Sequence, residues 1–230
     1  MPAASLTARL NEAESRHRLL NHGFLEAVRR GVSKDQVAVF LGQWWYPLHY
    51  FPTFLGRCVA SVARIETKTA ISKILYQETG AGNPRVSHET LYVKSMVGAG
   101  FEEAQITGAQ ALPETQALVD VYERASQSAL AAIGAIFGTE VVDLTMVSAV
   151  GNAVACATGE TDLEWVNIHL QQEPDHVEEA DHAVMGDFSA EDEDTIVANA
   201  EAIWHGWIGF FDRLAAAANL AEVASDVKTP

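Results

Sequence analysis

The chain has 230 residues, 48% of them hydrophobic, which is enough apolar material for a sizeable core in a single domain spanning residues 1–230. Its formal net charge of −16 argues against a nucleic-acid partner, because phosphate binding needs clustered Lys and Arg. The two cysteines, Cys58 and Cys156, form neither a disulfide framework nor a CxxC zinc motif. No apolar run reaches the length of a membrane span and the N-terminus has no signal-peptide h-region, so we expect a cytoplasmic protein without membrane contact.

Helical periodicity runs through almost the whole chain, and no strand or hairpin pattern is present. A first helix is expected from Leu6, and a second, short one runs through Phe24 and ends near Gly31. The stretch Ser33-Lys-Asp-Gln36 is a capping-box pattern, which predicts the start of a third helix.

The third helix is aromatic between Trp44 and Phe54, and this pattern is typical of a buried helix. Pro47 and Pro52 fall inside it, so we expect it to be kinked or interrupted. A fourth helix is expected up to the breaker cluster at 80–84, which reads Gly-Ala-Gly-Asn-Pro.

The second half of the chain begins with a short helix from Ser87, followed by a loop with a helical turn at 98–110. A long helix is expected at 114–137, then a break or tight packing at Gly138, then another helix at 140–154.

Two capping patterns, Thr161-Asp-Leu-Glu164 and Ser189-Ala-Glu-Asp192, predict the starts of the last two helices. The small, polar tail at about 219–230 should fray. The predicted fold class is all-α, a compact bundle of about seven to nine helices.

A possible metal-binding stripe lies on the helix that follows Thr161. His169, Glu173 and His176 stand at positions i, i+4 and i+7. At roughly 100° per residue, Glu173 lies about 40° from His169 around the helix axis, and His176 lies about 20° from it on the other side. Two imidazoles and a carboxylate suit iron, zinc or manganese without deciding among them. The alternative is an exposed acidic helix with incidental histidines.

A dinuclear iron site in a bundle takes carboxylates and histidines from several helices, all facing inward. Glu78 is a candidate because a negative charge is disfavoured at a helix C-terminus unless a cation compensates it. His88 lies ten residues later, and Glu140 stands in an apolar helical setting where charged residues are rare unless paired or metal-bound. The plainer interpretations are that Glu78 is a carboxylate at a helix end, that His88 is a surface histidine and that Glu140 caps a helix.

Two ExxH pairs, Glu173-x-x-His176 and Glu179-x-x-His182, follow each other on one predicted helix. Ferritin-like diiron proteins carry such pairs on different helices, which lets them face each other across the core. We therefore count only the first pair, and we expect His182 at the surface.

The pattern Asn21-His22-Gly-Phe24, followed by Phe40-Leu-x-Gln43-Trp44, resembles the N-terminal region of the haem-oxygenase-like helical superfamily. That superfamily includes thiaminase-II-like proteins and haem-oxygenase-like diiron oxidases. The diiron branch has a Glu, a His, a mid-chain Glu and a final His-x3-Asp-x2-His. The resemblance therefore implies these metal ligands: Glu78, His88, Glu140, His169, Glu173 and His176. Glu173 departs from the usual Asp, and Pro174 should bend the ligand helix.

The resemblance also implies two Fe²⁺ ions as cofactor, molecular oxygen as co-substrate and a homodimer. The expected function is oxidation of a small amino acid or a related carboxylate or amine, by desaturation, C–C cleavage or oxygenation, in natural-product biosynthesis. The alternatives within the family are oxidative decarboxylases of fatty acids or aromatic acids.

The aromatic stretch from Trp44 to Phe54 is either the wall of a substrate pocket or plain core. A carboxylate substrate would favour an arginine, for which Arg57 and Arg85 are candidates. The candidate substrate-binding residues are Trp45, His49, Arg57 and Tyr76.

Three other functions remain open. A thiaminase-II-like hydrolase needs a cysteine nucleophile and an acidic residue after the glutamine, but Trp44 and Trp45 follow Gln43, and Cys156 lacks a matching context. A haem protein would use His17 or His22 as its axial ligand. The third is a non-enzymatic helical binding protein.

Overall fold

The structure, a computed structural model, describes residues 5–218, so the predicted frayed tail at 219–230 lies outside the described residues. Over residues 5–218 it is helical without any strand, and the all-α prediction is confirmed. The elements are α1 (Leu6–Asn11), α2 (Glu14–Leu20), α3 (Gly23–Arg30), α4 (Lys34–Ser61), α5 (Ile65–Glu78), the 3-10 helix η1 (Pro84–Val86), α6 (His88–Gly98), α7 (Glu103–Thr107), α8 (Pro113–Ala125), α9 (Ala129–Thr158), α10 (Glu164–Val184) and α11 (Ala190–Ala217).

The described part of the chain thus has more α-helices than the predicted seven to nine. The predicted first helix is divided into α1 and α2, and the short α7 forms inside the expected loop at 98–110. Such one-turn helices carry too few residues for a periodic pattern to show in the sequence.

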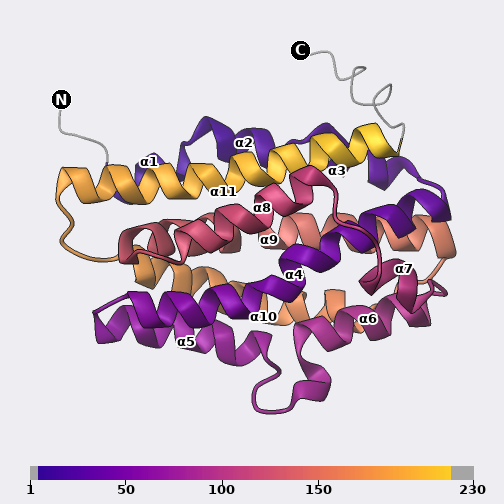
Figure 1. The fold of residues 1–230 in the computed structure, drawn as a ribbon, viewed down its shortest axis with the longest axis horizontal. Coiled ribbons are helices and arrows are strands. Elements are labelled where there is room, and N and C mark those ends of the chain that lie inside the picture. The colour runs from indigo at the N-terminus through magenta and orange to yellow at the C-terminus, as the bar shows by residue number, and fades with distance from the viewer. Residues whose placement is uncertain (1–4, 219–230) are drawn as a thin grey trace.

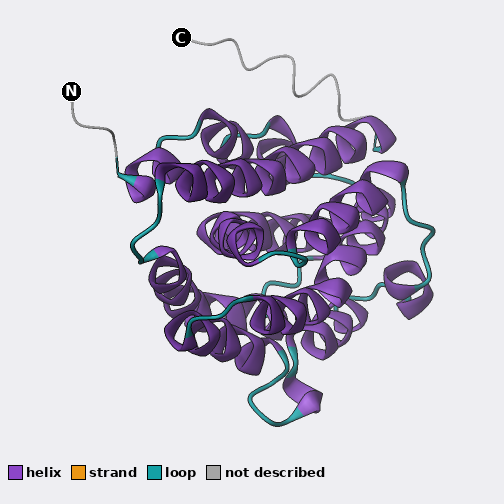
Figure 2. Ribbon diagram, turned by 60° about the vertical axis from the view of Figure 1, so that its left-hand side comes forward, coloured by secondary structure: helices purple, strands orange, loops and turns teal. Residues whose placement is uncertain are grey.

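The helices pack in tiers around α9. In Figure 1, α11 lies along the top with α2 and α3, while α5, α10 and α6 lie along the bottom. Between them run α4, α8 and α9, and α9 packs against α11, α10, α4 and α3. Figure 2 shows the same tiers after a turn of 60°, joined by loops.

The central helix α9 is apolar on all sides. Among the described residues it is the one helix long and apolar enough to cross a membrane, with a mean hydropathy of 1.7 over its most apolar window. However, 72% of that window is buried by the surrounding helices. A helix that is apolar all round and enclosed by its neighbours is the core element of a bundle.

Close packing between α9 and α11 explains why the predicted break at Gly138 is absent. A Cβ atom at Gly134 would lie 2.2 Å from the carbonyl oxygen of Ile196, and one at Gly138 would lie 3.1 Å from the Cα of Ala200. Of the two predictions for Gly138, a helix break or tight packing, the structure therefore supports tight packing. The chain instead breaks before Ser128, whose side chain caps α9 by accepting from the amide of Ala131 at 3.3 Å.

Two of the three predicted caps form as expected. Ser33 and Ser189 each make a capping box, and they begin α4 and α11. The Thr161 prediction was wrong, because α10 begins after Leu163 without a side-chain cap. The amide of Trp165 in its first turn donates instead to Ser95 Oγ of α6 at 3.0 Å, so a distant residue replaces the local cap.

The prolines of α4 do not interrupt it. The helix continues from Lys34 to Ser61 through Pro47 and Pro52. It also carries the buried Gln43, whose amide group donates to the carbonyl of Gln110 and accepts from Leu112 and Thr115. Gln43 therefore attaches the start of α8 to α4.

Candidate metal centre

A tight turn between α5 and α6 brings Glu78 and His88 together. Gly80 and Gly82 have φ angles of +86° and +89°, and Ala81 between them has +52°. A side chain at Gly80 would collide with the carbonyl oxygen of Asn83 at 2.2 Å, so this position requires glycine. The turn reverses the chain, and Oε1 of Glu78 lies 2.9 Å from Nδ1 of His88.

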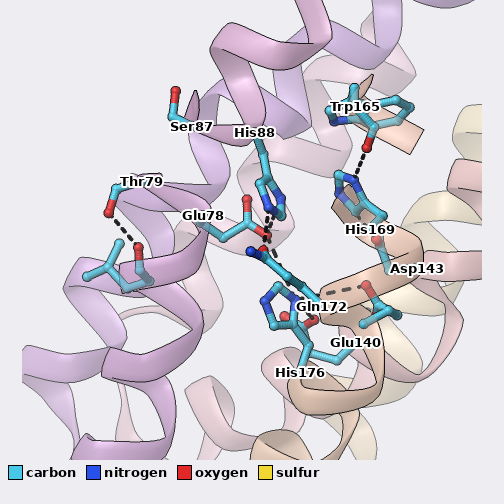
Figure 3. A network of polar contacts seen from close by, with 12 residues as sticks. Glu78, Thr79, Ser87, His88, Glu140, Asp143, Trp165, His169, Gln172 and His176 are labelled. Atoms are coloured by element: carbon cyan, nitrogen blue, oxygen red, sulfur yellow. Dashed lines mark hydrogen bonds and ion pairs between the residues drawn. The ribbon is translucent and has the colours of Figure 1, made fainter. Parts of the chain in front are cut away.

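His169 of α10 completes a first triad with these two residues (Figure 3). All three side chains are buried, and their ligand atoms lie within 4.8 Å of one another. This separation allows a single metal ion to sit among one carboxylate and two imidazoles.

A second triad lies beside the first. Glu140 of α9 and Glu173 and His176 of α10 are buried, with ligand atoms again within 4.8 Å of one another. Nδ1 of His176 lies 3.4 Å from Oε2 of Glu140 and 4.0 Å from Oε1 of Glu78, which belongs to the first triad. The fold thus brings all six predicted ligands together as two adjacent groups from four helices, α5, α6, α9 and α10.

The hydrogen bonds of two histidines determine which ring nitrogen faces the centre. Nδ1 of His169 lies 2.7 Å from the carbonyl oxygen of Trp165 and can only donate to it, so Nε2 carries the free lone pair. Nε2 of His88 lies 2.9 Å from the side-chain oxygen of Gln172, which leaves Nδ1 free on the side of Glu78. Metal-binding histidines commonly have such orienting acceptors.

Three carboxyl oxygens of the centre lack a hydrogen-bond donor, and this is the test of whether the residues suit a metal. Both oxygens of Glu173 and Oε1 of Glu140 are buried and accept no hydrogen bond. Burial, followed by the nearby Asp143 and Glu140 carboxylates, raises the pKa of Glu173 to about 12. Buried, unpaired acidic groups are costly unless a proton or a cation neutralises them. The donor set therefore fits divalent metal ions.

Glu78 behaves differently because it faces imidazoles. Burial by itself raises the pKa of its carboxyl, but His88, His176 and His169 outweigh this effect and lower the pKa to about 2. Glu78 is therefore ionised whether or not a metal is bound.

Two residues at the centre were missed by the sequence reasoning. Gln172 holds the ring of His88, and Asp143 lies one turn after Glu140 on the same face of α9 (Figure 3). Spacing of i, i+3 after a candidate ligand was the signal for Asp143. Gln172 carried no comparable signal, because its partner lies 84 residues earlier in the sequence.

A pocket opens next to the two triads and encloses no more than about 440 Å³. Its lining is mainly apolar and aromatic, with carboxylates and one ligand histidine on the side of the centre: Trp44, Pro47, Leu48, Phe51, Glu78, Tyr122, Thr139, Glu140, Asp143, Trp165, His169 and Trp207. Neither Lys nor Arg is among these lining residues, and neither cysteine is.

The four candidate substrate contacts, in contrast, do not reach this pocket. Trp45 stacks on His49, whose side chain is 60% exposed and lies 2.9 Å from Glu89. Arg57 pairs with Glu123 at the surface, and the exposed Tyr76 donates to the carbonyl of Ala81. Helical spacing explains why Trp45 and His49 of α4 do not line the pocket. Residues 44, 47, 48 and 51 share the face of α4 that lines it, whereas 45 and 49 project from another face.

The remaining histidines named from the sequence also lie away from the centre. His182 is exposed, as expected, and Glu179 beside it pairs with Lys73. Of the two candidate haem ligands, His17 is exposed, and both ring nitrogens of His22 already have partners in the protein, the amide of Phe24 and the carboxylate of Asp212.

Solved structures with the same fold come from several bacteria. A CADD-like protein of unknown function from Nostoc punctiforme has a TM-score of 0.77 at 14% identity, covering 93% of this chain and 95% of that one. A domain of unknown function with a haem-oxygenase-like fold from Shewanella denitrificans has a TM-score of 0.68 at 15% identity, covering 98% and 93%. A TenA homologue from Pseudomonas syringae pv. tomato has a TM-score of 0.71 at 15% identity, covering 92% of this chain and 91% of that one.

At these identities the likeness establishes the haem-oxygenase-like fold and nothing further. No curated protein matches the sequence. The model of one sequence family, described as iron-containing redox enzyme, matches residues 38–207, a range that contains all six residues of the two triads. The resemblance noted in the sequence is thus confirmed, and the chain belongs to this family of iron-containing redox enzymes.

Proposed function

We propose that this protein is a non-haem diiron enzyme that uses molecular oxygen to oxidise a small molecule. The observation that carries the proposal is the pair of adjacent, buried triads beside an apolar pocket. Two iron ions supply the redox chemistry when bound. The protein holds the ligand nitrogens in the required tautomers through Trp165 and Gln172, and the aromatic pocket wall excludes water.

The substrate that we propose is a small amino acid or a related carboxylate or amine, oxidised by desaturation, C–C cleavage or oxygenation in a biosynthetic pathway. The limited volume of the pocket supports a small substrate. Since no Lys or Arg lines the pocket, the metal ions are the cations there that a substrate carboxylate would bind. The aromatic lining keeps a second candidate open, an oxidative decarboxylase of fatty or aromatic acids. We also propose that the enzyme acts in the cytoplasm as a homodimer.

Anaerobic Fe²⁺ titration tests the diiron assignment. We expect about two irons per chain and a transient visible absorption after oxygen is admitted. His169→Ala and His176→Ala each remove one ligand from a different triad, so each should abolish tight binding of about one iron. His205→Ala is the matched control, because His205 is an exposed histidine of α11 outside both triads.

Iron uptake that is the same in the wild type, in both triad variants and in the control would contradict the ligand assignment. Uptake of two irons without any oxygen-dependent absorption would contradict the oxidase function while leaving the metal centre in place. Activity in a metal-free preparation would favour a hydrolase instead.

A further inference from the structure

Asp143 is a partly buried carboxylate next to the first triad, and it belongs to neither triad. It lies on α9, one turn beyond Glu140, and its side chain is about one-fifth exposed, toward the pocket. Its Oδ2 lies 3.8 Å from Nε2 of His169, in the first triad. It also lines the same pocket as Glu140, which belongs to the second triad.

The contact between Asp143 and His169 brings two acceptors together without a donor. Nδ1 of His169 donates to the carbonyl of Trp165, so the Nε2 atom that faces Asp143 presents a lone pair and not a proton. Glu173 presents carboxyl oxygens that receive no hydrogen bond from any donor group. No Lys or Arg among the described residues forms an ion pair with Asp143. Acceptor groups that converge in this way are stabilised by a cation between them.

We propose that Asp143 is a seventh protein ligand of the metal centre, a carboxylate that α9 would contribute from the side of the pocket. This inference rests on the proposed function and adds a residue to the six that the family pattern supplies. It also balances charge: Glu78, Glu140, Glu173 and Asp143 carry four negative charges, equal to the charge of two divalent ions. Six ligands with three carboxylates would leave the buried centre with an excess positive charge.

The position of Asp143 on the pocket wall also suits a second role, as the partner of a substrate ammonium group. The two roles differ in a measurable way. A ligand changes metal affinity and metal spectra without any substrate, whereas an ammonium partner changes only the binding of substrate.

The experiment is an anaerobic titration of Asp143→Asn with Co²⁺ and with Fe²⁺, followed by metal analysis and optical spectroscopy. We expect one of the two binding steps to weaken by about tenfold or more, and the Co²⁺ bands to shift because the coordination changes. The metal-free variant should melt at a higher temperature than the metal-free wild type, since it lacks one of several mutually repelling carboxylates. Asp143→Ala gives a second variant for the same titration.

Asp175→Asn is the matched control, because Asp175 is an exposed carboxylate of α10 that lies between Glu173 and His176 in the sequence. It should bind both metals like the wild type. If Asp143→Asn or Asp143→Ala also takes up two metal ions with wild-type affinity and unchanged Co²⁺ bands, the inference is wrong while the diiron proposal stands. If the wild-type chain itself binds no metal, both fail.

Discussion

Two single hydrogen-bond acceptors outside the six predicted ligands, one backbone carbonyl and one side-chain amide, orient the imidazole rings of His169 and His88. The carbonyl oxygen of Trp165 accepts a hydrogen bond from a ring nitrogen of His169, and the amide oxygen of Gln172 accepts one from a ring nitrogen of His88. Each bond leaves the opposite nitrogen as the ligand and restricts rotation of the ring. The affinity of the centre therefore depends on residues that never touch the metal.

Replacing Gln172 by Leu should weaken metal binding by about 10- to 100-fold, because His88 loses its orienting acceptor and its Nε2–H is left buried without a partner. Gln171→Leu is the control, since Gln171 is the exposed neighbour on the same helix. Competition with a chelator of known affinity measures the change. Equal affinities for the two variants would show that the bond to His88 has no such role.

Among the helices, the contact between α9 and α11 depends on the absence of side chains on one face of α9. Gly134 lets the backbone of α11 approach so closely that any Cβ would overlap the carbonyl oxygen of Ile196. The same helix carries Glu140 and Asp143, so this approach also determines how deep those carboxylates lie in the bundle.

Gly134→Ala should destabilise the protein by about 1–3 kcal/mol, because the added methyl group forces the two helices apart. Gly209→Ala in α11 should instead stabilise it by about 0.5–1 kcal/mol, since nothing lies within 4 Å of the added atom and alanine favours the helix. Urea unfolding of both variants measures the free energies. A stabilising Gly134→Ala would contradict the close packing described above.

For the molecule as a whole, the buried centre makes stability depend on pH and on metal. In the metal-free state Glu173 retains its proton, because its pKa is raised to about 12, and His176, with a pKa raised to about 9, retains its proton well above the usual value of 6.5. Unfolding releases these protons over the same pH range. A group whose folded pKa is raised contributes stability that is lost as the pH rises toward that pKa.

The melting temperature of the metal-free protein should therefore fall between pH 6.5 and 8.5. The free energy of unfolding should fall by up to about 1.4 kcal/mol per pH unit for each proton that the folded state retains. His169, whose pKa burial and His88 lower to about 3, is neutral in the folded state, so it opposes this slope only near pH 6.5, where the unfolded imidazole is still partly protonated. Bound metal ions take the place of these protons, so the melting temperature of the Mn²⁺-bound protein should fall less as the pH rises. The difference in melting temperature between the Mn²⁺-bound and metal-free protein should therefore increase with pH. Parallel curves would refute the predicted coupling, and Glu173→Gln should flatten the metal-free curve.

Much of the fold was predictable because its signals are local. Apolar periodicity predicts the long helices, and the caps at Ser33 and Ser189 need only neighbouring residues. His169, Glu173 and His176 share one face of α10 for the same reason, since helical spacing alone places them there. The break before Ser128 and the start of α10 were missed, and the amide of Trp165 in the first turn of α10 donates to Ser95, 70 residues earlier in the sequence.

By itself, therefore, the sequence determined the all-α class, the types of ligand and their order along the chain. Only the tertiary structure decided that the six predicted ligands meet as two adjacent triads, that Gln172 and Asp143 join them, and that Trp44 rather than Trp45 lines the pocket. The physical reason is that metal coordination, pocket lining and burial are distances through space. These distances depend on how closely whole helices pack, which local periodicity does not encode.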